Sequence, residues 1–330
     1  MKKAFLLKLK VFAVTAAALG MVLASSVATA AWEPKKPVEF IIMAGEGGGA
    51  DQMARLMQSI IDKNKLSSKP FIPINKAGGS GAEALRYLKD KSGDDHIVMI
   101  TLNSFYTTPM LNPELEVDVS TFTPIGRMAL DTFLLWVHSD TDIKSLDDYV
   151  ASVKAKGNAW KMGGTGQGQE DSLVTGMLEN KFGFKVTYVP FPGGGTVAKN
   201  LIGKHIDSTV NNPSEQLGFF EAGQSRPLMA LTPERLPQFP DVPTSAEAGH
   251  PELVYYMQRS INAPPGMSAE AQAYYVDLFK KVFDSKEWQE FCSSDGIFCN
   301  EWLGAEALAA YHKTETAKHA TLLKGMGLVK

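Results

Sequence analysis

The chain has 330 residues and a formal net charge of −3, from 33 lysine and arginine and 36 aspartate and glutamate side chains. This length is sufficient for two lobes that each bury a core of their own. The mildly acidic balance argues against nucleic acid or an anionic membrane surface as a binding partner, so neither is expected.

The first thirty residues are typical of a secretory signal peptide. Lysines at positions 2, 3, 8 and 10 precede an apolar stretch over residues 11–23, and Ala28-Thr29-Ala30 fits a small-x-small cleavage site. An uncleaved membrane anchor is the alternative, but the apolar stretch is short for a span. We therefore expect cleavage near Ala30 and a mature protein in the periplasm. Loss of four lysines and no acids takes the formal charge from −3 to −7.

The mature part begins with an expected strand over 38–43, a glycine loop and an expected helix over 51–63. The loop contains Gly45, Gly47, Gly48 and Gly49. Glycines leave backbone N–H groups accessible, and a helix N-terminus adds about half a positive charge. The loop therefore predicts an anion-binding site.

Strands and helices then alternate along the chain. Strands are expected over 71–74, 97–101, 133–137, 161–163, 186–189 and 207–210, and helices over 82–90, 145–156, 172–181, 197–202, 269–284 and 305–324. Ser145 is expected to cap its helix. This alternation predicts an α/β fold built on parallel sheet with helices on both faces.

A second glycine loop, over residues 162–171, has the same features as the first. Open α/β sheets bind ligands at the carboxyl edge of their strands, where both loops and several neutral polar side chains are expected. The candidate ligand-binding residues are Gly47, Gly48, Gly49, Asp51, Asn75, Gly78, Asn103, Ser104, Thr165, Gly166, Gly168, Asn211 and Asn212. Two such loops predict a protein that holds a small carboxylate or similar anion from two sides.

Enzyme signatures are missing from the sequence. It contains no H-E-x-x-H, no G-x-S-x-G, no P-loop motif and no Cys/His cluster at metal-ligand spacing, and its six histidines are scattered. We therefore expect no enzyme activity, no metal and no cofactor.

Dinucleotide binding is the main alternative for the first loop. Gly45-x-Gly47-x-x-Ala50 after a strand satisfies a loose form of the Rossmann fingerprint. The second strand, however, lacks the acid at its end that would hold a ribose, and Glu46 would repel a pyrophosphate. An exported nucleotide-dependent enzyme is therefore the weaker alternative.

Two cysteines, Cys292 and Cys299, lie close together in a chain that is expected to reach an oxidising compartment. A small structural disulfide is the favoured interpretation, and two buried free thiols are the alternative. The spacing is not that of a redox-active C-x-x-C pair.

Short motifs throughout the mature chain carry a family resemblance. Residues 240–249 match the pattern P-D-V-P-T-x-x-E-x-G, residues 263–266 match A-P-x-G, and residues 189–194 match V-P-Y-x-G-G with phenylalanine for tyrosine. The opening loop matches P-G-G-x-x-D-x-x-A-R over residues 46–55, except that Glu46 stands in place of the proline. In these motifs the chain resembles the periplasmic substrate-binding proteins of the tripartite tricarboxylate transporter family, the Bug receptors.

The resemblance implies a two-lobed periplasmic binding protein fold of the Venus-flytrap, type II-like kind, which closes over a small carboxylate. Lobe one would comprise residues 31–131 plus 256–330, and lobe two residues 132–255. The implied partners are integral membrane transporter subunits, and the receptor is expected to be a monomer. A ligand-sensing input for a membrane signalling protein uses the same fold and is the alternative function.

The sequence departs from the family pattern at acids near the two loops. Glu46 replaces the usual loop proline, and residues 169–172, QEDS, replace T-x-x-H. The favoured interpretation is that Glu46, Glu170 and Asp171 are solvated and stabilise helix starts. The sharper hypothesis is that they select a ligand with an amine or hydroxyls as well as a carboxylate. Arg55 is expected to pair with an acid or to cap the lobe rather than to contact the ligand.

Overall fold

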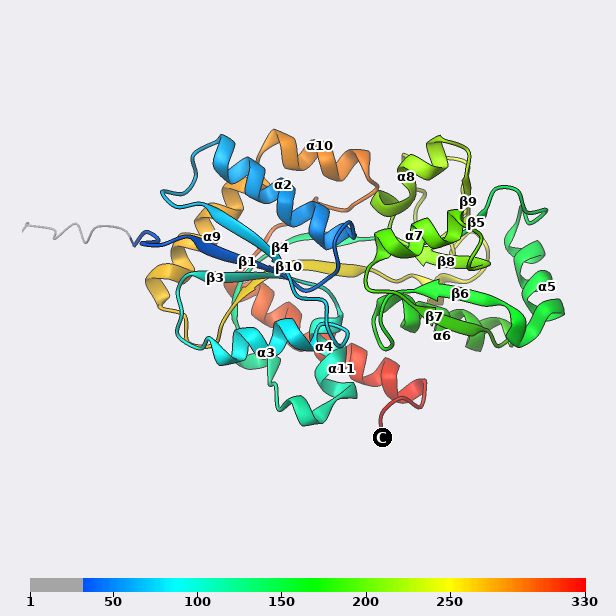
Figure 1. Ribbon diagram of the computed structural model, residues 1–330, viewed down its shortest axis with the longest axis horizontal. Coiled ribbons are helices and arrows are strands. Elements are labelled where there is room, and N and C mark those ends of the chain that lie inside the picture. Colours follow the sequence, from blue (N-terminus) through cyan, green and yellow to red (C-terminus); the bar gives the residue numbers. More distant parts are fainter. Residues whose placement is uncertain (1–31) are drawn as a thin grey trace, which may run out of the picture. The chain divides into compact units, whose positions relative to one another are not determined.

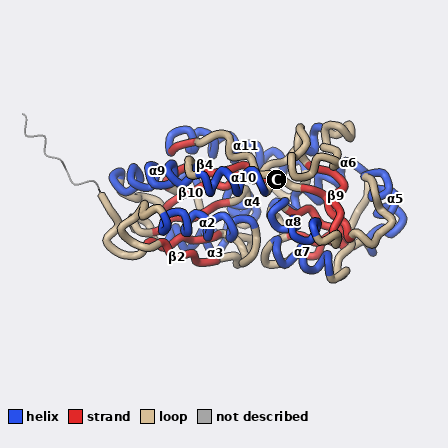
Figure 2. Tube along the Cα trace, turned by 90° about the horizontal axis from the view of Figure 1, so that it is seen from above, coloured by secondary structure: helices blue, strands red, loops and turns tan. Residues whose placement is uncertain are grey.

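The computed structural model describes residues 32–330, so the expected signal peptide and its cleavage site at Ala30 lie outside the described residues. Residues 33–330 form one compact unit with two β-sheets, each accompanied by helices (Figure 1). Figure 2 shows the strands of the two sheets as separate groups. Within residues 32–330, no helix combines the length and apolar character that a membrane span requires.

The first sheet has six strands in the order β11-β4-β10-β3-β1-β2. These are β1 (Val38–Ile42), β2 (Phe71–Asn75), β3 (Ile97–Thr101), β4 (Thr123–Asp131), β10 (Met257–Ala263) and β11 (Leu303–Gly304). Its helices are α2 (Gly49–Lys63), α3 (Ala82–Asp90), α4 (Ser104–Leu111), α9 (Ala269–Phe283), α10 (Lys286–Ser294) and α11 (Ala305–Gly325). We call these elements the first lobe. Rings of Phe40, Phe71 and Phe279 pack edge to face in its core.

The second sheet has five strands in the order β7-β6-β8-β5-β9. These are β5 (Leu134–His138), β6 (Lys161–Gly164), β7 (Thr187–Pro190), β8 (Ser208–Asn211) and β9 (Ser225–Ala230). Its helices are α5 (Leu146–Lys156), α6 (Glu170–Phe182), α7 (Gly194–Ile202) and α8 (Pro213–Glu221). We call these elements the second lobe. Trp136 is fully buried in its core, and Ser145 Oγ accepts the N–H of Asp148 at 3.1 Å, which confirms the predicted cap of α5.

The α/β class is confirmed, but the expectation of parallel sheet alone is wrong, because both sheets are mixed. In the first, β1 is parallel to β2 and β3, whereas β10 is antiparallel to β3 and β4. In the second, β6 is parallel to β7 and β8, whereas β5 is antiparallel to β8 and β9. The antiparallel strands flank the two places where the chain passes between sheets, from β4 to β5 and from β9 to β10.

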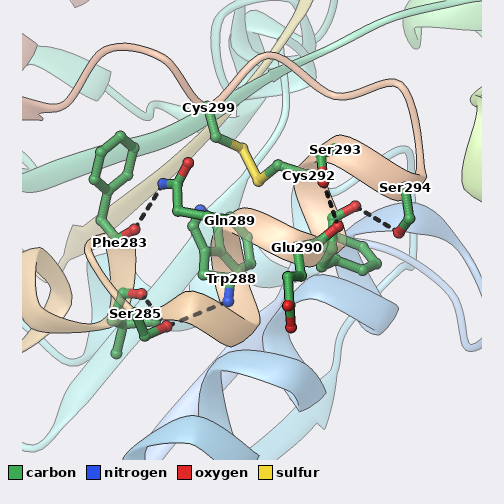
Figure 3. Close-up of a disulfide and its surroundings, with 11 residues drawn as sticks. Phe283, Ser285, Trp288, Gln289, Glu290, Cys292, Ser293, Ser294 and Cys299 are labelled. Atoms are coloured by element: carbon green, nitrogen blue, oxygen red, sulfur yellow. Dashed lines mark hydrogen bonds between the residues drawn. A yellow bond between two sulfur atoms is a disulfide. The ribbon is translucent and has the colours of Figure 1, made fainter. Parts of the chain in front are cut away.

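A disulfide joins Cys292, in α10, to Cys299, with their Cα atoms 6.0 Å apart (Figure 3). The neighbouring Phe298 exchanges two backbone hydrogen bonds with Leu130, both 2.9 Å long. Leu130 is the second-last residue of β4, just before the chain enters the second lobe. The disulfide therefore fastens α10 to the end of a strand that leads from one lobe to the other.

Candidate ligand-binding site

A small cavity of about 30 Å³ lies where the two glycine loops meet, with enough room for one or two water molecules. Residues of both lobes line it, so it opens between the sheets at the carboxyl ends of their parallel strands. The lining residues are Ala44, Gly48, Gly49, Ala50, Ala77, Leu102, Thr165, Gln169, Glu170, Asp171, Pro192, Gly193, Gly194, Asn212, Glu215, Met257 and Arg259.

Five helices begin at or beside this cavity. The first residues of α2, α6 and α7 line it, as does Asn212, the N-cap of α8. The fifth helix, α4, begins at Ser104, whose backbone N–H donates to Glu170. Each N-terminus has N–H groups without an acceptor inside the helix and about half a positive charge, so the backbone makes the cavity attractive to anions.

The first glycine loop already binds an acid of its own helix. Gly47, with φ at +73°, donates its N–H to Asp51 Oδ2 at 2.9 Å. Arg55 Nε and Asn75 Nδ2 donate to Asp51 Oδ1 at 2.9 and 3.0 Å, which confirms the predicted acid partner of Arg55. Burial opposes ionisation of Asp51, but these hydrogen bonds and the charge of Arg55 outweigh it and lower its pKa.

The second glycine loop binds acids and an amide in the same way. Thr165 N–H donates to Asp171 Oδ2 at 2.8 Å, and Gly166 N–H donates to Gln169 Oε1 at 2.6 Å. Glu170 instead accepts the N–H of Ser104 from the first lobe. Glu170 and Asp171 are only 2% and 4% exposed, so the expectation that they are solvated is wrong. Burial raises the pKa of both carboxyls, well above the usual value for Asp171.

Glu215 is a third acid in the cavity wall, and it too connects the lobes. Its Oε1 accepts the N–H of Gly49 at 3.1 Å, across the gap between lobes. Its Oε2 accepts the N–H of Asn212 at 3.1 Å and Asn211 Nδ2 at 2.7 Å, which completes a capping box at the start of α8. Burial raises its pKa. Several of the backbone donors expected for a ligand are thus bound to the chain's own side chains.

Arg259 supplies the positive charge of the cavity. It is 1% exposed, and its guanidinium forms a buried ion pair with Asp131, in which Nε lies 3.0 Å from Oδ2. Its Nη2 also donates to Asn212 Oδ1 at 3.1 Å. Within residues 32–330, its Nη1 has no hydrogen-bond partner. A buried guanidinium N–H without an acceptor is costly, which marks this atom as a donor for a ligand.

The guanidinium lies directly against the first glycine loop. A Cβ atom placed on Gly49 would approach Arg259 Nη2 to 2.7 Å and Asp131 Oδ2 to 3.3 Å. The glycine at this position therefore allows α2 to begin beside the ion pair, and it brings the N-terminus of α2 to the side of Arg259.

The structure places the predicted residues in three groups. The cavity wall contains Gly48, Gly49, Thr165, Asn212, Glu170 and Asp171. Behind the wall lie Gly47, Asp51, Asn75, Asn103, Ser104, Gly166, Gly168 and Asn211, which hold the loops and helix starts. Glu46 is exposed, and Gly78 donates its N–H to Glu83 at the start of α3.

Asn103 and Asn75 show why polar side chains at strand ends need not face a ligand. Asn103 Nδ2 donates to Tyr255 Oη and to the carbonyl oxygen of Tyr256, while its Oδ1 accepts the N–H of Gln258. Asn75 Nδ2 donates to the carbonyl oxygen of Ala44 as well as to Asp51. Asn103 connects the start of α4 to the segment that leads into β10, and Asn75 connects the end of β2 to the first glycine loop.

Arg259, Asp131 and Glu215 are not among the residues predicted from the sequence. Glu215 could be predicted from the sequence, because Asn212 and an acid three residues later form a capping-box pattern. Arg259 lies within β10, which is buried along its whole length. In the sequence, only the charge of Arg259 distinguishes it from the other residues of this stretch. No group of three or more His, Cys, Asp or Glu side chains within the described range is arranged to hold a metal ion.

Solved structures with the same fold define the class of protein. BugD, described as a periplasmic binding protein, superposes with a TM-score of 0.84 over 90% of this chain and 99% of its own, at 22% identity. MatC from Rhodopseudomonas palustris, solved with bound malate, gives a TM-score of 0.82 over 88% and 99%, at 20% identity. The chain thus has the two-lobed periplasmic binding protein fold, as the sequence predicted.

Sequence comparisons give the family. Residues 53–328 match the profile described as "Tripartite tricarboxylate transporter family receptor". A UPF0065 protein encoded in the gbd 5′ region of Cupriavidus necator is 25% identical over 320 residues, which are 96% of each chain. The chain belongs to the tripartite tricarboxylate transporter family receptors, which confirms the predicted resemblance.

Proposed function

We propose that the protein is a periplasmic receptor that binds a small organic carboxylate between its lobes and delivers it to integral membrane transporter subunits. The observation that carries this proposal is the buried Arg259 Nη1, a donor without a partner among residues 32–330 at a cavity lined by both lobes. Malate bound to MatC, a protein of the same fold, supports a carboxylate as the class of ligand.

The proposed receptor consists of a mature chain released by cleavage near Ala30. Its lobes comprise residues 31–131 plus 256–330 and residues 132–255, and it works as a monomer. Gly49, Thr165, Asn212 and Arg259 line the proposed ligand site, with the two glycine loops on opposite sides of it. A ligand that touches both lobes stabilises the closed state, so closure follows from binding as a population shift.

Closure also involves hydrogen bonds between the lobes themselves. Besides Gly49 to Glu215 and Ser104 to Glu170, Thr107 Oγ1 donates to the carbonyl oxygen of Gly168 at 3.1 Å. The cavity is too small for a ligand of malate's size, so ligand entry requires the lobes to separate and some of these bonds to break.

The test is ligand identification with the mature protein. Mass spectrometry of co-purifying small molecules, followed by thermal shift over mono-, di- and tricarboxylates, is expected to find a carboxylate that raises the melting temperature. Uptake of that compound by cells is expected to require both the receptor and its membrane subunits. Selective binding of a solute with no anionic group would overturn the proposal, and N-terminal sequencing of the exported protein tests the cleavage site.

A further inference from the structure

The acids around the cavity, which the proposed function does not use, indicate what else the ligand carries. Asp131, Glu170, Asp171 and Glu215 surround the cavity or the guanidinium that lines it. Asp131, Glu170 and Asp171 are buried and Glu215 is half-buried, and each is held by specific donors. Asp51, in the first turn of α2, is paired with Arg55.

The charges of the cavity are close to balance when all four acids are ionised, although burial raises the pKa of each. Five helix N-termini at about half a positive charge each, together with Arg259, face these four carboxylates. A ligand with two negative charges and no positive one would disturb this balance in a space that excludes water. Buried charge without a counter-charge is strongly unfavourable, so the balance favours a ligand of low net charge.

Both signs of charge are present in the wall of the cavity. Arg259 Nη1 is fully buried and lacks an acceptor within the described residues. Glu170 and Asp171 are consecutive residues in the first turn of α6, and both line the cavity. Asp171 accepts the N–H of Thr165, and Glu170 accepts the N–H of Ser104 and that of its own backbone, whereas a carboxylate has about four acceptor sites. Both retain acceptor capacity for a donor such as an ammonium group.

We infer that the ligand carries a cationic nitrogen as well as a carboxylate, with the carboxylate bound by Arg259 and the nitrogen by Glu170 and Asp171. This inference rests on the proposed function, because it assumes the same cavity and a carboxylate ligand. It assigns the amine-selecting role to the two acids of α6, whereas Glu46, the acid of the first loop, is exposed and does not line the cavity.

The experiment compares pairs of ligands in which one member carries an amino group and the other a hydroxyl group on the same carbon. Aspartate and malate form one pair, glutamate and 2-hydroxyglutarate a second, and alanine and lactate a third. Titration calorimetry with the mature protein is expected to give at least tenfold tighter binding for the amino member of the pair that fits. Glu170→Gln and Asp171→Asn are each expected to reduce this preference about tenfold.

Two further variants separate the roles of the groups. Arg259→Lys keeps the buried positive charge but not the guanidinium geometry, and is expected to weaken both members of a pair by the same factor. Asp147→Asn removes an exposed acid from the first turn of α5 and is expected to change neither member. Circular dichroism and the melting temperature verify that each variant is folded before titration.

The possible outcomes distinguish this inference from the proposed function. If the hydroxy members bind as tightly as the amino members, the inference is overturned and the carboxylate receptor stands. The inference is also overturned, and the carboxylate receptor stands, if dicarboxylates bind with uptake of protons. Proton uptake is detected as a dependence of the binding enthalpy on the buffer, and it would show that the acids are neutralised by protonation. If no carboxylate of any pair binds and a solute without one does, both proposals fail.

Discussion

The carboxylate of Glu215 in the second lobe accepts a hydrogen bond from the backbone N–H of Gly49 in the first lobe, at 3.1 Å. The same carboxylate caps its own helix through the N–H of Asn212. It therefore lies between the N-termini of α2 and α8, where both helix dipoles stabilise its negative charge. In the proposed receptor, closing the lobes would bring the start of α2 to this charge, so we expect Glu215 to stabilise the closed state.

Glu215→Gln keeps the size of the side chain and removes its charge. A hydrogen bond to a charged group contributes about 1.5–3 kcal/mol and a neutral one about 0.5–1.5 kcal/mol, so the closed state is expected to lose about 1 kcal/mol. Energy transfer between dyes on the two lobes should show about a fivefold smaller ratio of closed to open molecules.

Glu221→Gln is the control for this change, because Glu221 is exposed at the other end of the same helix. It should leave the ratio unchanged. Equal ratios in wild type and Glu215→Gln would show that the contact across the lobes contributes nothing to closure.

Gly49→Ala tests the close approach of α2 to the buried ion pair. The added Cβ would lie 2.7 Å from Arg259 Nη2, which must move away from Asp131. Because disrupting a buried ion pair costs about 3–5 kcal/mol, urea unfolding is expected to show a loss of about 2–3 kcal/mol, since the pair shifts without being removed.

Gly218→Ala is the matched glycine substitution in α8, where no atom lies within 4 Å of the added Cβ. It is expected to stabilise the protein by up to about 1 kcal/mol, because alanine has the higher helix propensity. Similar destabilisation by both substitutions would remove the ion pair from the explanation.

The sequence revealed the parts of the fold that depend on local pattern. The strand, glycine loop and helix around Gly45–Asp51 and the repeat around residues 162–171 are where they were predicted, because glycine content and apolar spacing encode them directly. The strand β10 was missed, because its polar residues Gln258, Arg259, Ser260 and Asn262 are buried by partners in distant segments. The pattern of neighbouring residues in the sequence does not identify such partners.

The chemistry of the cavity was predicted only in part for the same reason. The helix starts that attract anions follow from local sequence, but the burial of Glu170 depends on Ser104, which lies 66 residues away in the other lobe. Taken alone, an acid in the first turn of a helix is typical of a solvated dipole partner. In the structure, contact with the other lobe leaves this acid buried.

The disulfide between Cys292 and Cys299 is expected to stabilise the protein mainly by restricting the unfolded chain. In the chain-entropy model, a loop of this length contributes about 2.5 kcal/mol. The variant with both cysteines changed to serine should therefore lose about this amount in urea unfolding, whereas wild type with added reductant should approach the variant. If reductant affects the variant as much as the wild type, the change reflects something other than this bond.

Asp295, inside the loop that the disulfide closes, is expected to make stability depend on pH. Burial, assisted by the negative charges of Asp131 and Glu221, raises its pKa from 3.8 to about 6. Between about pH 4 and 6 the folded protein thus holds a proton that the unfolded chain has released, so this carboxyl lowers the free energy of unfolding as the pH rises through that window.

Asp295→Asn removes this dependence. The raised pKa sets an upper limit of about 3 kcal/mol, and solvent around the half-buried group reduces the expected gain at pH 7 to about 1 kcal/mol. Urea unfolding should therefore find the variant more stable than wild type at pH 7 and equal to it below about pH 3, where the carboxyl is largely protonated in both states. Asp90→Asn, at an exposed position at the end of α3, should follow the wild type at both pH values. A constant difference between Asp295→Asn and wild type across the pH range would mean that the substitution acts through packing rather than through the charge of the carboxyl.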